Sequence, residues 1–336
     1  MTLALTTTAL PAMAAAEGPP AGAAAAALDS LAVAFVKLAL AAGQLDTDYV
    51  DAYTGPPEWA AEAAPRSLSS LRAEAAALQA RLATLDRGAL TPALIARERY
   101  LAAQLRALGG RLAVLASERL DFDAEAQLLF DATLPEVQPA RGEAARARLA
   151  VLLPGEGPLR ERFEAYERRF FVPREKIAAV MEAAIAECRR RTRARIPLPE
   201  AESFALELVS GEPWSAYNWY QGAGKSLIQV NLDQAFRIWS ALGLAAHEGY
   251  PGHHVENLLV ERELAAGRGW VEFRLSPLFS PRCVVSEGMA QVAAELAFPG
   301  EERLAFTRGA LFPLAGCDPA EAARYSEVMT LVEQEL

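Results

Sequence analysis

The stretch TPALIARERYLAAQLRALGGRLAVLASERL, residues 91–120, shows which class of fold this chain adopts. Its leucines recur at spacings of three, four and seven residues, so they line one face of an α-helix. The residues on that face are Leu94, Leu101, Leu105, Leu108, Leu112 and Leu115. Thr91 and Pro92 form a suitable N-cap and first-turn pair. Similar helical patterns cover residues 69–85, 158–171 and 173–195. The chain is therefore predicted to be mainly α-helical.

The composition is that of a globular protein with an acidic surface. The chain has 336 residues, of which 52% are hydrophobic, and this is enough to bury a sizeable core. Its net charge of -10 argues against a nucleic-acid partner. The arginine-rich segment 188–197 lacks interleaved aromatic residues and ends a predicted helix, where cations complement the helix dipole. Cys188, Cys283 and Cys317 are widely separated and contain no C-x-x-C pair, so they are expected to be buried structural thiols.

Residues 1–28 form an apolar, alanine-rich leader, which we expect to be disordered ahead of a first helix near Asp29. The leader lacks the basic segment of a secretory signal, which favours a cytoplasmic protein. Its small residues nevertheless resemble a cleavage region, so export stays open as the alternative. No later run of about 18 apolar residues is free of charges, and no membrane span is therefore predicted.

The chain divides into two predicted subdomains. Residues 29–198 form a helical N-terminal subdomain, in which LDTDYVDAYTGPPEW, residues 45–59, is a loop because it contains glycine and two prolines. The character changes from residue 199 to residue 336. FALELV and SLIQVN, residues 204–209 and 226–231, alternate as strands do and are expected to form an antiparallel ribbon joined by a long aromatic-rich connection. A helix from Asp233 to Gly249 then follows.

All three histidines of the chain lie in HEGYPGHH, residues 247–254, beside Glu248. Two imidazoles and a carboxylate can bind zinc and leave one position open for water. In the motif H-E-x-x-H the histidines are four residues apart and share one helix face. Here the position four residues after His247 is Pro251, so a regular helix would bring neither His253 nor His254 to His247.

A break in this helix would allow His253 or His254 to approach His247 despite the unsuitable spacing. Pro251 removes a helical hydrogen bond and Gly252 permits unusual torsions, so the backbone can fold a later imidazole back beside His247. The alternative is three histidines that lie on the surface or are satisfied in the core. A further ligand is expected from Glu287 in the apolar helix of residues 284–298, because a buried glutamate is costly unless it is paired or bound to metal. Glu287 lies 40 residues after His247, which leaves room for one helix between them; a capping role is its competing interpretation.

HEGYPGHH together with SEGMAQVAAELAF, residues 286–298, resembles the H-E-x-x-P-G-H-H and E-G-W-A motifs of the DUF885 family of bacterial proteins. That family is similar to the zincin metallopeptidases, with a glutamate as the third zinc ligand. VDAYTGPPEW, EPWSAYNWYQGAGKSLIQVN and LDQAFRIWSALGLAAHE match as well, so the resemblance extends from about residue 45 to the end. It implies a zincin-like multi-helix metallopeptidase fold with a small antiparallel β ribbon beside the active-site helix.

The resemblance also implies roles for individual residues. His247 and Glu287 would be zinc ligands and Glu248 the general base. His253 corresponds best to the second histidine ligand, with His254 as the alternative. The strand of residues 226–231 would lie along the cleft and hold an extended substrate by β-addition.

Two features depart from the family's pattern. Met289 stands where the family usually has tryptophan. Family members also continue past the point equivalent to YSEVMTLVEQEL, residues 325–336, with helices that carry tyrosine and arginine residues near the site. We therefore expect the metal site to be retained and substrate orientation to be weakened.

The expected function is zinc-dependent hydrolysis of a peptide or a small amide, in which the ion activates a water molecule and residues 199–336 form the catalytic zinc-binding subdomain. Candidates for contacting the substrate are Tyr217, Tyr220, Tyr250 and Asn231, although the tyrosines are equally plausible as packed aromatic residues. One alternative is a non-catalytic helical binding or scaffold protein with a vestigial or structural metal site. Another is a hydrolase of small esters or amides. The sequence predicts neither the oligomeric state nor the cleavage preference.

Overall fold

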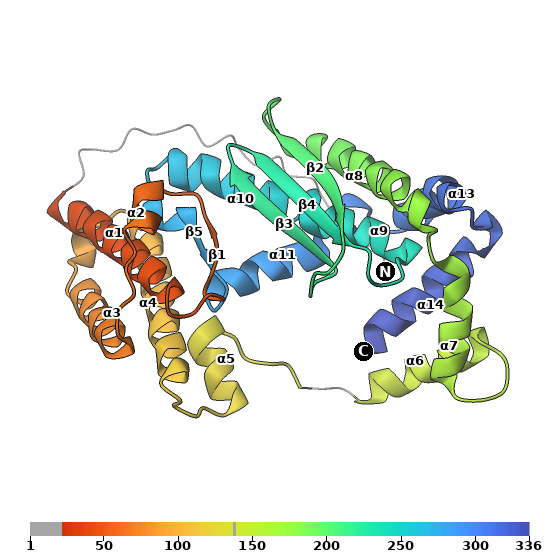
Figure 1. Ribbon diagram of the computed structural model, residues 1–336, viewed down its shortest axis with the longest axis horizontal. Helices are drawn as coiled ribbons and strands as arrows, with labels where there is room; N and C mark the ends of the chain where they lie inside the picture. Colours follow the sequence, from red (N-terminus) through yellow and green to blue (C-terminus); the bar gives the residue numbers. More distant parts are fainter. Residues whose placement is uncertain (1–21, 137–138, 336) are drawn as a thin grey trace.

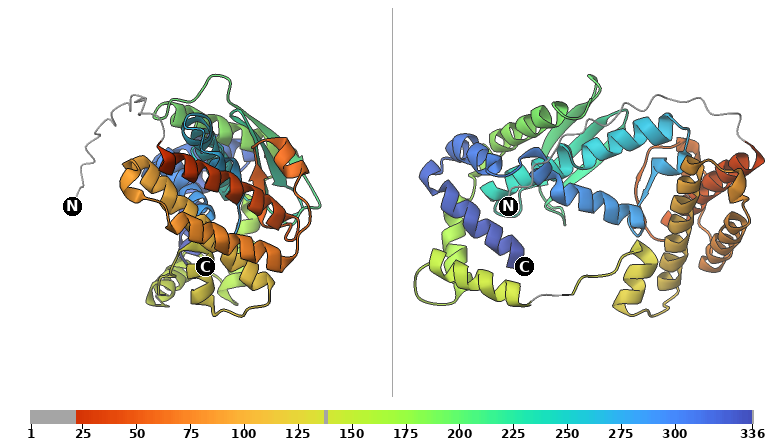
Figure 2. Two further views of the ribbon diagram at one scale, coloured as in Figure 1. Left: turned by 90° about the vertical axis from the view of Figure 1, so that its left-hand side faces the viewer. Right: turned by 180° about the vertical axis from the view of Figure 1, so that it is seen from behind.

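The structure is a computed structural model that describes residues 22–136 and 139–335. It is mainly helical with two small sheets, as the sequence predicts. Figure 1 shows α1 to α5 gathered at one end of the molecule and α6, α7, α13 and α14 at the other. The three-stranded sheet and the helices α9 to α11 lie between them. The view from behind in Figure 2 shows α10 and α11 running side by side through this middle part.

The first hydrophobic core lies among α1 (Ala23–Gly43), α3 (Leu68–Ala83) and α4 (Pro92–Leu115). The Thr91 side chain accepts a hydrogen bond from the backbone N–H of Leu94, so the predicted N-cap is confirmed. The predicted apolar face of α4 is also confirmed over its middle part. Its fully buried members are Leu101, Leu105, Leu108 and Leu112.

Helix α1 begins six residues before the predicted start at Asp29, inside the expected leader. A run of alanines has the highest helix propensity of any residue type, which explains the earlier start. The rest of that leader, residues 1–21, lies outside the described residues. Within the described part, α1 is the one helix that is long and apolar enough to cross a membrane, and 50% of that window is buried. Its leucines pack in the first core.

The second core joins α6 (Pro139–Leu152), α7 (Leu159–Glu167) and α8 (Ile177–Arg193) to the C-terminal helices. Its buried residues run from Leu149 to Met329. The border predicted at residue 199 is therefore wrong as a division between cores. Periodicity shows that a helix has an apolar face, but it does not show which partner covers that face. The remaining helices are α2 (Pro57–Ala61), α5 (Phe122–Phe130), α12 (Glu302–Phe306), α13 (Phe312–Ala315) and α14 (Ala322–Glu335).

The larger sheet has three strands in the order β2-β4-β3: β2 (Ser203–Val209), β3 (Ala216–Gly222) and β4 (Lys225–Asn231). β2 pairs with β4 in parallel, so the predicted antiparallel ribbon is wrong. The segment read as a connection contains β3, which pairs antiparallel with β4. A two-residue turn with positive φ at Ala223 and Gly224 joins β3 to β4, and this geometry suits a tight hairpin. Since β4 has a strand on either side, it has no free edge for a substrate.

A second sheet pairs β1 (Val50–Tyr53) with β5 (Leu275–Pro277). β1 lies within the segment predicted to be a loop, and α2 begins in it. All three cysteines are free, but only Cys188 is fully buried. The predicted helix from Asp233 begins instead at Ile238 as α9 (Ile238–Leu244). α10 (His253–Val260) and α11 (Pro281–Ala297) complete the middle of the molecule.

Candidate metal centre

The expected helix break is present. After α9 the residues Ala245–Gly249 form a π-helical turn, closed by a 3.1 Å hydrogen bond from the Tyr250 N–H to the Ala245 carbonyl. The Gly252 N–H then bonds to the Ala246 carbonyl at 2.9 Å, and α10 starts at the next residue. The peptide bond before Pro251 is cis. The two hydrogen bonds show that the chain turns back between the two parts of the histidine motif.

Gly252 makes this turn possible because its backbone packs on the preceding turn. A Cβ atom at this position would lie 1.9 Å from the carbonyl oxygen of His247 and 2.4 Å from that of Ala246. Both distances are far below a van der Waals contact, so position 252 admits only glycine while the turn keeps this shape.

The turn brings His247, His253 and Glu287 together. The two imidazole rings are perpendicular, with centroids 4.7 Å apart. His247 Nε2 lies 3.4 Å from Glu287 Oε2, and His253 Nε2 lies 3.2 Å from Glu287 Oε1. Two atoms that each lie about 2.1 Å from one tetrahedral zinc ion are about 3.4 Å apart. The spacing and the donor types therefore fit a zinc ion with two imidazole ligands and one carboxylate ligand.

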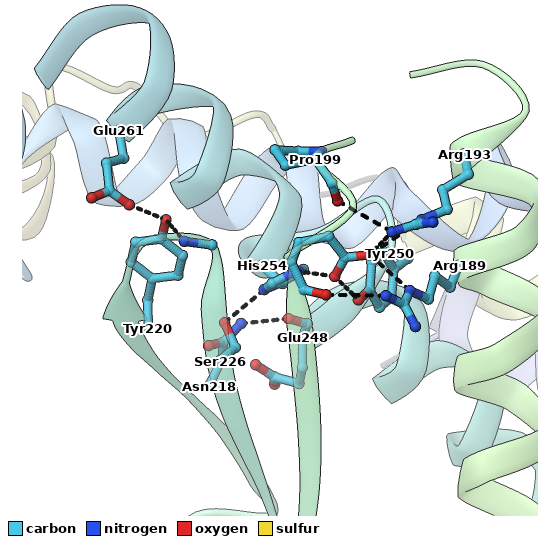
Figure 3. Close-up of polar contacts among 12 residues, drawn as sticks. Arg189, Arg193, Pro199, Asn218, Tyr220, Ser226, Glu248, Tyr250, His254 and Glu261 are labelled. Carbon is cyan, nitrogen blue, oxygen red and sulfur yellow. Dashed lines mark hydrogen bonds and ion pairs between the residues drawn. The ribbon is translucent and has the colours of Figure 1, made fainter. Parts of the chain in front are cut away.

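His254 is not part of this cluster. Its side chain is fully buried, with Nδ1 2.8 Å from Ser226 Oγ and Nε2 3.2 Å from Glu202 Oε2 (Figure 3). Both ring nitrogens are engaged on the core side of α10, so the alternative assignment of His254 as a ligand is wrong. Consecutive helical residues point about 100° apart, and only one of this pair can face the cluster.

Glu248 is buried, with 7% of its surface exposed, and lines the same cavity as the cluster. Burial raises the pKa of its carboxyl above the ordinary value, although His247 and His253 oppose the rise. Its backbone carbonyl accepts a 2.5 Å hydrogen bond from Asn218 Nδ2 of β3, which fixes the turn to the sheet.

A second layer of polar groups orients His253. Its Nδ1 lies 3.2 Å from Ser286 Oγ, and Ser286 in turn donates a hydrogen bond to the carboxylate of Glu256. Burial alone would lower the pKa of His253, but hydrogen bonds with Glu256 and Glu287 outweigh it and raise the pKa to about 10. Hydrogen bonds from His247 and His253 lower the pKa of Glu287. Sequence reasoning missed Ser286 and Glu256, although Glu256 lies one helical turn after His253.

The cluster opens into a cavity of about 820 Å³. Residues 215–218, at and just before the start of β3, form part of one wall, and Glu287, Gln291 and Glu295 of α11 line another. This volume suits a ligand of several residues. Parts of the chain that no sequence pattern links to the site also contribute to its lining. They include Asp51, Trp239, Arg282 and Arg303.

Of the four predicted substrate contacts, Tyr217 alone lines the cavity; its hydroxyl donates a 2.5 Å hydrogen bond to Asp51 Oδ1. Tyr220 donates to the carboxylate of Glu261 instead. Tyr250 is fully buried and donates to Glu202. The Asn231 amide donates to the backbone carbonyls of residues 212 and 214. The structure contradicts the last three predictions because these side chains do not line the cavity and their polar groups are hydrogen-bonded elsewhere in the fold.

Comparisons with known proteins add little to this site. No family model matches the chain, and no curated protein matches it. A solved structure described as "putative lipoprotein from Colwellia psychrerythraea" matches with 15% sequence identity and a TM-score of 0.33, over 92% of this chain and 66% of that one. This chain therefore spans about two thirds of that protein's length. At this TM-score the likeness carries no argument, and the resemblance to the DUF885 family stays an expectation from its motifs.

Proposed function

We propose that the protein is a zinc-dependent hydrolase that cleaves peptide bonds. The observation that carries the proposal is the spacing of His247 Nε2, His253 Nε2 and the Glu287 carboxylate, which suits a single tetrahedral ion. Three protein ligands leave a fourth position for water, which is the composition of a catalytic zinc site. The adjoining cavity of about 820 Å³ supplies room for a peptide.

Zinc bound here would polarise the scissile carbonyl and lower the pKa of its water molecule. The protein's own groups then handle the proton. The Glu248 carboxylate is next in sequence to a ligand and faces the same cavity, so it is placed to accept the proton and return it to the leaving amine. Tyr217 lines the cavity beside it.

The substrate would lie against β3, which is one of the two edge strands of the three-stranded sheet and the one whose residues line the cavity. Residues at the start of β3 line the cavity, and the edge of this strand away from β4 can pair with an extended peptide. This replaces the expectation that residues 226–231 hold the substrate. A peptide therefore fits better than a small ester, because a small ester would leave the strand edge unused.

The test is metal analysis combined with a broad peptide library. We expect about one zinc ion per chain, cleavage that stops on chelation and returns with zinc, and loss of the metal in His253→Ala. If chelation changed only the melting temperature and no peptide were cleaved, the site would be structural and the scaffold alternative would hold. If His253→Ala bound zinc as well as the parent protein, the ligand set would be wrong.

Zinc affinity should depend steeply on pH. His253 must lose its proton before it binds zinc, and its pKa is raised to about 10. A raised pKa keeps the proton bound at neutral pH, so zinc competes with it, and affinity should increase about tenfold per pH unit between about pH 7 and 9. Chelator competition at several pH values measures this slope. Glu256→Gln, which removes one of the carboxylates, should flatten it, whereas a flat profile in the parent protein would contradict the assignment.

We also propose a cytoplasmic location. The three cysteines are free, as is usual in a reducing compartment. Fractionation of cells that express the full chain tests this, and recovery of the protein in the membrane or outside the cell would overturn it.

A further inference from the structure

Glu202, just before β2, is a buried carboxylate outside the cavity, and its side chain is 0% exposed. Its Oε1 accepts hydrogen bonds from two arginines of α8, at 2.7 Å from Arg189 Nε and 2.9 Å from Arg193 Nη2. The sequence indicated only a solvated basic helix end here. Burial alone would raise the pKa of Glu202, but hydrogen bonds from Tyr250 and these arginines lower it, so the carboxylate is ionised.

The other carboxylate oxygen joins the two sides of the helix break. Tyr250, before the break, donates its hydroxyl to Glu202 Oε2 at 2.5 Å. His254, after the break, has its Nε2 3.2 Å from the same oxygen. Figure 3 shows Tyr250 and His254 converging with the two arginines at this point. One oxygen atom therefore holds both ends of the segment that reverses the chain.

The imidazole of His254 is fixed from its other side as well. Its Nδ1 lies 2.8 Å from Ser226 Oγ in β4. Ser226 and Glu202 therefore hold the ring through both of its nitrogen atoms. The ring packs against Phe204 and Tyr250, with centroids 5.5 Å and 5.0 Å away. These contacts hold the imidazole of His254 in one orientation.

The orientation of His254 determines that of His253. The two are adjacent in the first turn of α10, where successive side chains differ by about 100° in direction. The break interrupts the helix just before this turn, so continuous helical hydrogen bonds do not set its rotation. With His254 held on the core side, His253 is directed at His247 and Glu287.

We propose that Glu202 is the positioning residue of the metal centre, and that by holding Tyr250 and His254 on one carboxylate oxygen it sets the angle at which His253 meets His247. The expected effect of Glu202 on zinc affinity rests on the proposed function. Its expected effect on the placement of the His247 and His253 rings does not. Among the described residues, the side chains that hydrogen-bond to the Glu202 carboxylate are neither proposed zinc ligands nor part of the cavity lining, so Glu202 would act through the backbone on either side of the break.

The test compares Glu202→Gln with Glu272→Gln. Glu272 is a matched control because it is equally buried, at 0% exposure, and is also held by an arginine, with Arg97 Nε 2.6 Å from its Oε1. Each variant removes the negative charge of a buried ion pair, so both should have a lower melting temperature than the parent protein.

The chain has only three histidines, so imidazole signals in NMR spectra can be assigned one by one. The metal-free parent protein should show a nuclear Overhauser effect between the rings of His247 and His253.

Glu202→Gln should lose this ring-to-ring signal, and Glu272→Gln should keep it. Zinc affinity, measured by chelator competition, should fall about 10 to 100-fold in Glu202→Gln and remain within about twofold of the parent in Glu272→Gln. Tyr250→Phe removes one bond to Glu202 while keeping the ring, and it should give a smaller change in the same direction. If Glu202→Gln does not fold, Tyr250→Phe tests the positioning role in its place.

The proposal is overturned if Glu202→Gln keeps both the ring-to-ring signal and the parent affinity. It is equally overturned if Glu272→Gln loses them to the same extent, because general destabilisation would then explain the result. If the parent protein lacks the signal, the geometry itself is wrong. If the signal is lost only in Glu202→Gln but the parent binds no zinc, the positioning role stands and the proposed hydrolase function fails.

Discussion

Glu248→Gln should reduce peptide hydrolysis by about 10² to 10⁴-fold while zinc binding stays unchanged. Glutamine has nearly the same shape as glutamate but cannot accept the proton of the attacking water. The carboxylate of Glu248 is not a member of the three-residue cluster formed by His247, His253 and Glu287. Removing it therefore removes a base and leaves the metal site complete. Initial rates on a cleaved peptide, together with the zinc content of the same preparation, measure the two effects.

Glu295→Gln is the matched control for this prediction. Glu295 lines the same cavity from α11, two turns beyond Glu287, and the exchange is chemically identical. It should change the rate no more than a few-fold, because Glu295 lies too far along the helix to reach the same water molecule. Unchanged hydrolysis in Glu248→Gln would show that another group is the base. Loss of zinc in that variant would show that Glu248 is a ligand.

Gly252→Ala should have the largest effect on the metal site, with zinc affinity reduced more than about 100-fold. The added Cβ would lie 1.9 Å from the carbonyl oxygen of His247, and both groups belong to the backbone. The turn has to open to remove this overlap, and opening it moves His253 away from His247. Overpacking of this kind typically costs about 1 to 3 kcal/mol of unfolding free energy. Chemical denaturation and chelator competition measure the two losses.

Gly309→Ala provides the comparison for this variant. Gly309 also lies in a helical segment, and nothing lies within 4 Å of the position where its Cβ would be placed. An alanine there should leave zinc affinity unchanged and stabilise the protein by about 0.5 to 1 kcal/mol, because glycine loses more freedom on folding. Normal zinc binding by Gly252→Ala would mean that the turn does not have the shape described.

Sequence patterns predicted those parts of the fold that depend on neighbouring residues. The N-cap at Thr91 and the buried leucines of α4 follow from local hydrogen bonding and helical periodicity. The same patterns gave the wrong sheet. β2 and β4 each alternate as strands do, but alternation does not show whether a third strand lies between them in sequence or which direction a neighbour runs.

The candidate site was likewise predictable only in part from the sequence. The clustering of histidines beside Glu248 and the proline-glycine break were visible in the sequence, and so was Glu287 as a partner. The sequence favoured His253 over His254 only by analogy, whereas the structure separates them through Glu202, which is 52 residues away from His254. Tyr220, Tyr250 and Asn231 were misplaced for a related reason, because each is satisfied by a partner that only the fold brings near.

The sequence by itself determined that the chain is helical, that its chain direction is interrupted at Pro251 and Gly252, and that imidazole and carboxylate groups are concentrated there. Only the tertiary structure decided which imidazole turns toward Glu287, which strand borders the cavity and which polar groups are already paired. The physical reason is the distance along the chain over which each kind of interaction acts. Helical periodicity and backbone torsion act over a few residues, whereas the direction of a buried side chain is set by partners from distant parts of the chain that packing brings within hydrogen-bond distance.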